Sequence, residues 1–149
     1  MNEPDQLTGL LDAGVSTFMN SEQIEPTETE LGARNLDIGF VGVPFDSTCL
    51  SRTGANQAPN EIRKVSCQTH PYNFEYDVRI SDIYSLVDFG DVQTLPGNAE
   101  KTVHRAQTVV SRLINDGIAP VVAGGDHSIS IANLKAVGEI YDNPGFIML

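Results

Sequence analysis

The residues best suited to chemistry form the run Gly-Gly-Asp-His-Ser at 124–128. This run follows the apolar, β-branched stretch 118–123 and precedes residues with helical spacing, so it is expected where a strand passes into a helix. The glycines allow a sharp turn and close approach to a ligand, while Asp126 or Ser128 can cap the helix. A neutral imidazole such as that of His127 can bind a divalent metal. The spacing alone therefore fits either a plain capped turn or a metal or acid–base site.

Alternating strands and helices are expected to position this run. Four apolar stretches predict buried strands: 36–45, 83–92, 118–123 and 145–149. Strands alternating with helices predict right-handed crossovers and a mostly parallel sheet. Ligands bind at the carboxyl ends of the strands in such sheets, so residues 124–128 fall at the expected binding edge.

Helical spacing defines the segments between these strands. Pro59 suits the first turn of a helix that carries Ile62 and Val65. Asn98 can cap a helix with an apolar stripe and Gly117 can close it; the stripe is Val103, Ala106, Val110, Leu113 and Ile114. A further helix at 129–140 follows the spacing of Ile131, Leu134 and Val137. A glycine-interrupted helix is predicted within 5–19, a surface loop at 20–35 and irregular structure at 69–82.

Composition excludes several classes of protein. The 149 residues carry 20 acidic and 9 basic side chains, and this net charge of -11 argues against nucleic-acid binding. The start of the chain does not resemble a secretory signal, and no apolar run approaches a membrane span, so we expect a cytoplasmic protein without a membrane partner. Cys49 and Cys67 are too few for a disulfide framework and are expected to be reduced thiols.

Four ordered stretches resemble the ureohydrolase family, which includes arginase, agmatinase, guanidinobutyrase and formimidoylglutamase. Gly-Gly-Asp-His-Ser resembles the first metal-binding motif of that family, and Ala-Gly-Val-Ser-Thr-Phe-Met at 13–19 is similar to a segment near the start of agmatinase-like members. Gly-Val-Pro-Phe-Asp at 42–46 resembles another family motif, together with Arg-x-Gly at 52–54 and Ala-Pro-x-x-Ile-Arg at 58–63. Val-Asp-Phe-Gly-Asp-Val at 87–92 resembles a family strand end.

The resemblance implies a fold and an activity. The fold would be a three-layer α/β/α arrangement with a mostly parallel, arginase-like sheet that is incomplete at the C-terminus. The activity would be hydrolysis of a linear guanidino compound at a site with two Mn2+ ions, most closely agmatine to putrescine and urea, because the motifs at 42–46 and 13–19 favour the agmatinase-like branch. Family members commonly form homo-oligomers, so a trimer or hexamer is expected of a full-length protein.

The resemblance also assigns roles to individual residues. His127 would be a ligand of one manganese, whereas Asp126 would lie beside the metal and orient its neighbours. The residues that bind substrate stay unassigned. Arg52 and Arg63 are interpreted as salt-bridge residues rather than as substrate contacts. Asp88 and Asp91 are interpreted as turn formers rather than as catalysts.

Other residues receive weaker roles or depart from the pattern. His70 and His104 have no partner at ligand spacing, so we expect a loop residue and a solvated helix residue. Ala58 stands where the family often has glycine, and Thr53 stands where it often has proline. The loop before the helix at Pro59 is therefore expected to differ in shape from that of many relatives.

The resemblance leaves most metal ligands unaccounted for. In the family, the strand equivalent to 145–149 leads into an Asp-Ala-His-x-Asp motif and later an Asp-x-Asp motif. We therefore expect an N-terminal arm with a short helix at 1–35 and the truncated first part of a ureohydrolase domain at 36–149, inactive by itself. Guanidinobutyrase, arginase or formimidoylglutamase activity is an alternative, as is a non-catalytic α/β binding module. A hydrolase with Ser128 as nucleophile would need a Gly-x-Ser-x-Gly elbow, which the sequence lacks.

Overall fold

The computed structural model describes residues 16–26, 31–32, 34–69 and 72–148. Most of the helix predicted within 5–19 lies outside this part of the chain, and so does His70. At the end of that segment, Phe18–Asn20 forms the short 3-10 helix η1.

A parallel four-stranded sheet forms the centre of the fold. Its strand order is β1-β5-β2-β6, and the bounds are β1 Glu22–Gln23, β5 Leu86–Asp91, β2 Ile38–Val43 and β6 Ala119–Gly124. All three pairings between neighbours are parallel. Three of the predicted strands are therefore confirmed: β2 and β5 are shorter than their apolar stretches, and β6 is shifted by one residue.

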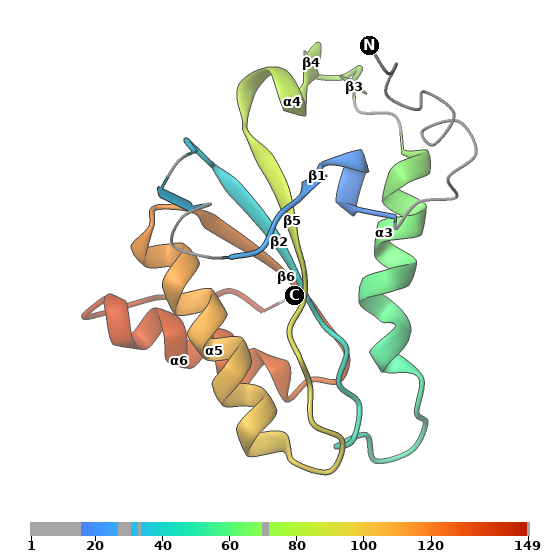
Figure 1. Cartoon of the computed structure of the whole chain (residues 1–149), viewed down its shortest axis with the longest axis vertical. Helices are drawn as coiled ribbons and strands as arrows, with labels where there is room; N and C mark the ends of the chain where they lie inside the picture. Colours follow the sequence, from blue (N-terminus) through green and yellow to red (C-terminus); the bar gives the residue numbers. More distant parts are fainter. Residues whose placement is uncertain (1–15, 27–30, 33, 70–71, 149) are drawn as a thin grey trace, which may run out of the picture.

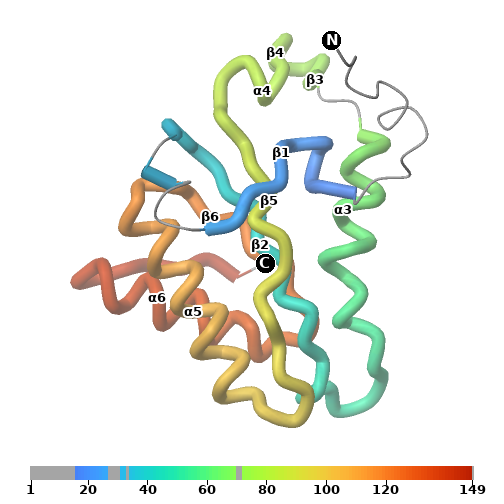
Figure 2. Tube along the Cα trace, in the orientation of Figure 1, coloured from blue at the N-terminus to red at the C-terminus, as the bar shows by residue number. Residues whose placement is uncertain are grey.

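Helices cover both faces of this sheet. The helix α3 (Ala58–Gln68), preceded by the 3-10 turn η2 (Ala55–Gln57), lies on one face together with η1, whereas α5 (Ala99–Asn115) and α6 (Ile129–Ile140) pack together on the other. Figure 1 shows these three layers, and Figure 2 shows the same path along the chain. The predicted three-layer α/β/α fold is confirmed.

The helix α5 follows the sequence prediction closely. The Asn98 side chain accepts a hydrogen bond from the Lys101 amide at 3.0 Å, and Gly117 closes the helix with a left-handed φ of 77°. Val103, Ala106, Val110 and Leu113 are buried against the sheet, as the apolar stripe indicates. Thr102 is also buried, because its hydroxyl hydrogen-bonds with the backbone of Leu95 and Asn98.

The central strand β2 requires close approach of the backbone. Phe40, Val41 and Val43 are almost completely buried. A side chain at Gly42 would overlap the Asp91 carboxylate of the neighbouring strand, so only glycine fits there.

Two predictions about loops and strands are wrong. Residues 20–35 were expected to form a surface loop, but Glu22–Gln23 pairs with β5, and Ile24 and Leu31 are buried. Residues 145–148 were expected to form a buried strand, but they have no strand structure and are exposed. Apolar letters identify a strand only if a neighbouring strand provides hydrogen bonds, and none of the described strands lies beside 145–148.

The helix faces were also predicted incorrectly in part. On α3 the buried residues are Pro59, Arg63 and Ser66, whereas Ile62 and Val65 are exposed. On α6 the buried residues are Ile129, Ala132 and Ala136, and both Ile131 and Leu134 are about half exposed. Small alanines allow α6 to approach its neighbours closely, so packing distance rather than hydrophobicity selected the inner face.

Residues 69–82 are more ordered than the sequence indicated. The strands β3 (Tyr72–Asn73) and β4 (Val78–Arg79) form a small antiparallel hairpin, and α4 (Ile80–Ile83) follows and includes the first residue of the predicted second strand. Among the described helices, none has the length and apolar composition needed to cross a membrane.

Candidate functional site

The carboxyl ends of β2 and β6 lie level with each other. Val43 is paired with Gly124 at the last position of both strands, so the two following loops leave the sheet side by side. The Asp126 amide donates to the Phe45 carbonyl oxygen at 2.7 Å, and a side chain at Gly125 would overlap that same carbonyl group. The second glycine of the motif is therefore required by the contact between the loops.

Asp126 accepts hydrogen bonds from both sides of this junction. One carboxylate oxygen, Oδ2, accepts from the Thr48 amide at 2.9 Å and the Thr48 hydroxyl at 2.6 Å. The other, Oδ1, accepts from the Ser128 amide at 3.0 Å and the Ser128 hydroxyl at 2.5 Å. Partial burial alone would raise the pKa of Asp126, but these four hydrogen bonds lower it below the ordinary aspartate value.

These contacts explain how the helix after the motif begins. Ser128 occupies the N-cap position of α6 but makes no side-chain capping bond, and Asp126 binds the Ser128 amide instead. Of the two capping residues considered from the sequence, Asp126 is thus the one whose carboxylate binds a backbone amide at this turn. Its acceptor positions are engaged by protein donors, which suits a residue that orients the turn.

His127 lies exposed at the same rim. It borders an open pocket of ≈ 480 Å³ whose lining includes residues 48–52 and Ser128. It also borders a smaller pocket of ≈ 250 Å³ at the start of α6. That second pocket contains Asn133, whose Oδ1 atom is buried and has no hydrogen-bond partner among the described residues. His127 therefore separates two spaces that both carry polar groups.

The donor set for a metal is only partial in the described residues. His127 offers an accessible imidazole, but no group of three or more His, Cys, Asp or Glu side chains within the described ranges could hold a metal ion. Cys49 borders the larger pocket, but burial raises the pKa of its thiol, and the charges of Asp126 and Asp46 raise it further.

The aspartates of β5 bind an arginine of the α3 helix. Arg63 donates to both carboxylate oxygens of Asp88, through Nε at 2.7 Å and Nη2 at 2.9 Å, and to Asp91 at 2.6 Å. It also lies over the Phe40 ring, with the guanidinium carbon 4.9 Å from the ring centroid. The salt-bridge interpretation of Arg63 is confirmed. Asp88 is fully buried within β5, and besides binding Arg63 it accepts a hydrogen bond from the Gly90 amide at 2.8 Å, the local bond typical of a turn-forming aspartate.

The remaining candidates lie away from this cluster or contribute little to it. Arg52 is exposed in the loop that lines the larger pocket. His104 is exposed on α5, as predicted. Thr48 was not identified from the sequence, since only the long-range approach of two loops makes it a partner of Asp126.

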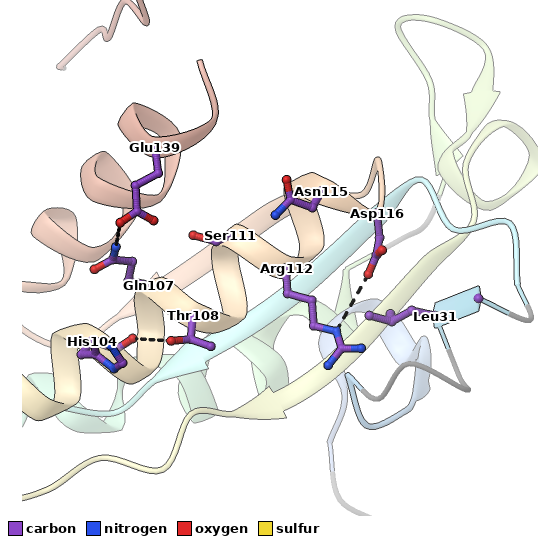
Figure 3. Close-up of a pocket in the computed structure, with 10 residues that line it drawn as sticks. Leu31, His104, Gln107, Thr108, Ser111, Arg112, Asn115, Asp116 and Glu139 are labelled. Atoms are coloured by element: carbon purple, nitrogen blue, oxygen red, sulfur yellow. Dashed lines mark hydrogen bonds and ion pairs between the residues drawn. The ribbon is translucent and has the colours of Figure 1, made fainter. Parts of the chain in front are cut away.

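A larger pocket lies elsewhere in the described part of the chain. It has a volume of ≈ 780 Å³, follows α5 and reaches Glu139 of α6 (Figure 3). Several of its polar groups bind one another: Gln107 donates to Glu139 at 2.6 Å, and the Thr108 hydroxyl donates to the His104 carbonyl group at 2.9 Å. Its lining includes no residue that follows the carboxyl end of β2, β5 or β6, so its size does not identify it as the reaction site.

Comparison with known proteins identifies the family. The sequence profile of the Arginase family matches residues 36–149. The chain belongs to the arginase family. The match extends over β2, β5 and β6 and over the loops that form the Asp126 junction, so the site described above lies within the shared part of the fold.

Individual arginase-family proteins are similar over most of this chain. Guanidinobutyrase of Pseudomonas aeruginosa is 32% identical over 134 residues, which cover 90% of this chain and 41% of the relative. Mitochondrial agmatinase of Gallus gallus is 33% identical over 122 residues, which cover 82% and 35%. The solved structure of proclavaminate amidinohydrolase from Streptomyces clavuligerus aligns with a TM-score of 0.75 and 30% identity, covering 85% of this chain and 40% of that one.

The chain thus spans about two fifths of the length of these relatives. The similarity establishes the family and the fold of the part that they share. Activity and substrate depend on the whole protein.

Proposed function

We propose that this chain forms the amino-terminal part of a ureohydrolase that converts a linear guanidino compound, agmatine first of all, into urea and an amine. The observation that carries the proposal is the junction at the carboxyl ends of β2 and β6, where Asp126 fixes the turn that presents His127. The arginase-family match covers both loops of this junction.

The proposed cofactor is manganese, with two ions in a complete site. Bound there, manganese would generate a hydroxide nucleophile near neutral pH and polarise the guanidinium group. His127 is the residue of this chain proposed to hold one ion. Because the described residues contain no further group of ligands, the other donors would have to come from sequence equivalent to the uncovered part of the relatives.

The residues of this chain would then bind and orient. Asp126 keeps its carboxylate on Thr48 and Ser128, so it sets the position of the His127 backbone without itself binding the metal. Residues 48–52 border the pocket beside His127 and would limit the space for a substrate there. The Ser128 hydroxyl donates to Asp126. Ser128 would therefore stabilise the start of α6 and would not act as a nucleophile.

An assay of urea release tests the proposal. Two proteins are compared: the 149-residue chain, and the same chain extended by the remaining part of guanidinobutyrase, which begins with the Asp-Ala-His-x-Asp segment. Each would be incubated with Mn2+ and agmatine, guanidinobutyrate or arginine. We expect urea from the extended protein, its loss by a factor of at least about 100 in a His127→Ala variant, and none from the short chain. Agmatine is expected to be the best substrate; guanidinobutyrate is the second candidate because guanidinobutyrase matches 90% of the chain.

The same samples separate the competing functions. A binding module would release no urea and would not bind Mn2+ tightly even when extended. A serine hydrolase would form an adduct with a serine-directed inhibitor, whereas we expect no adduct at Ser128. Turnover by the short chain would contradict the need for additional metal ligands.

A further inference from the structure

The loop after β2 is attached to the Asp-His motif by one side chain. Thr48 contributes both its amide and its hydroxyl to the same Asp126 oxygen, at 2.9 and 2.6 Å. The adjoining residues 49–52 then line the open pocket that His127 also borders. The hydrogen bonds between Thr48 and Asp126 thus fix the position of this pocket wall relative to the imidazole.

Other contacts fix the two ends of the loop but not its middle. At the start, the Asp126 amide binds the Phe45 carbonyl group; at the end, the Gly54 amide donates to the Asp46 carboxylate at 2.7 Å. The Cys49 amide closes a local turn onto the Asp46 carbonyl oxygen at 3.2 Å. Among the described residues, Thr48 is the loop position whose side chain bonds across to the turn after β6.

We infer that Thr48 is a positioning residue of the reaction. Its hydrogen bonds to Asp126, the Thr48 latch, hold the pocket wall at 48–52 in a fixed place beside His127. A substrate bound at His127 would meet this wall, so the latch would contribute to substrate binding more than to the bond-breaking step. This inference rests on the proposed function, but the latch itself is a property of the short chain. Charge assistance from the Asp126 carboxylate makes its bond to the Thr48 hydroxyl stronger than one between neutral groups.

Hydrogen exchange in the 149-residue chain tests the latch. The Thr48→Val variant keeps a branched side chain of similar size and loses the hydroxyl. We expect the hydrogen-bonded amides of Thr48, Cys49 and Gly54 to exchange about fivefold faster in this variant, as for loss of one hydrogen bond, while α5 stays unchanged as an internal reference. Thr48→Ser should restore the slow rate, because it keeps the hydroxyl.

A second variant provides a control in the same loop. Ser51→Ala also removes a hydroxyl from the pocket wall but not from the Asp126 contacts, and it should leave the exchange of 48–54 unchanged. Equal exchange in wild type and Thr48→Val, or equal acceleration in Ser51→Ala, would overturn the latch. Faster exchange throughout α5 would mean general destabilisation and would likewise contradict a local role.

Kinetics of the extended protein test the role in the reaction. Thr48→Val should raise KM for the best guanidino substrate about fivefold with little change in kcat, and Thr48→Ser should restore KM. A lower kcat at unchanged KM would overturn the role in substrate binding. Absence of urea release from the unmodified extended protein would instead refute the proposed function, while the exchange result would still decide the latch.

Discussion

Arg63 is the residue whose contacts most clearly contribute to stability. Its side chain is 7% exposed and that of Asp88 is 1% exposed, so each charge depends on the other for compensation. Burial alone would lower the pKa of the Arg63 guanidinium, but hydrogen bonds and charges from Asp88 and Asp91 raise it above the ordinary arginine value. The cluster also holds the N-terminal segment, because the Phe18 amide donates to Asp88 at 2.8 Å.

Replacement of this arginine should therefore be costly. Arg63→Met leaves the Asp88 carboxylate buried without its cation, and we expect a loss of about 3–5 kcal/mol in the free energy of unfolding. The matched control is Lys64→Met, which removes the exposed pair with Glu61 and should cost less than about 1 kcal/mol. Urea denaturation followed by circular dichroism measures both, and similar midpoints for the two variants would contradict the prediction.

At the scale of elements, α5 depends on its first turn. Asn98 accepts the Lys101 amide, and the chain reaches this cap directly from the end of β5 through the Pro96-Gly97 turn. Asn98→Ala should lower the free energy of unfolding by about 1 kcal/mol, because it leaves a helix N–H without its partner. Asn115→Ala, at the exposed last position of α5, should change it by less than about 0.5 kcal/mol. Thermal or urea unfolding compares the two; equal effects would show that the cap contributes nothing.

At the scale of the whole molecule, the strand β6 has a strand neighbour on one side only among the described residues. The strand β6 lies last in the strand order and Val121 is 42% exposed, while Ile131 and Leu134 of α6 are about half exposed. Phe146 and Ile147 are also exposed. An edge strand with an exposed apolar side chain favours pairing with another chain.

The isolated 149-residue chain should therefore self-associate as its concentration rises. Val121→Lys places a charge on the edge strand and should shift the weight-average mass toward the monomer in sedimentation experiments. Val65→Lys puts the same charge on exposed α3 and should leave association unchanged. A wild-type chain that stays monomeric at every concentration would contradict association through β6.

The sequence by itself determined the strands β2, β5 and β6, the cap and stripe of α5, and the turn at Gly125, because each depends on local periodicity or on residues a few positions apart. The four motifs, in their order along the chain, also indicated the family. The inner faces of α3 and α6, the burial of Asp88 and the partnership of Thr48 with Asp126 were decided only by the tertiary structure. Each of these depends on which segment packs against which across tens of residues, and that pairing of distant segments cannot be inferred from the local spacing of residues.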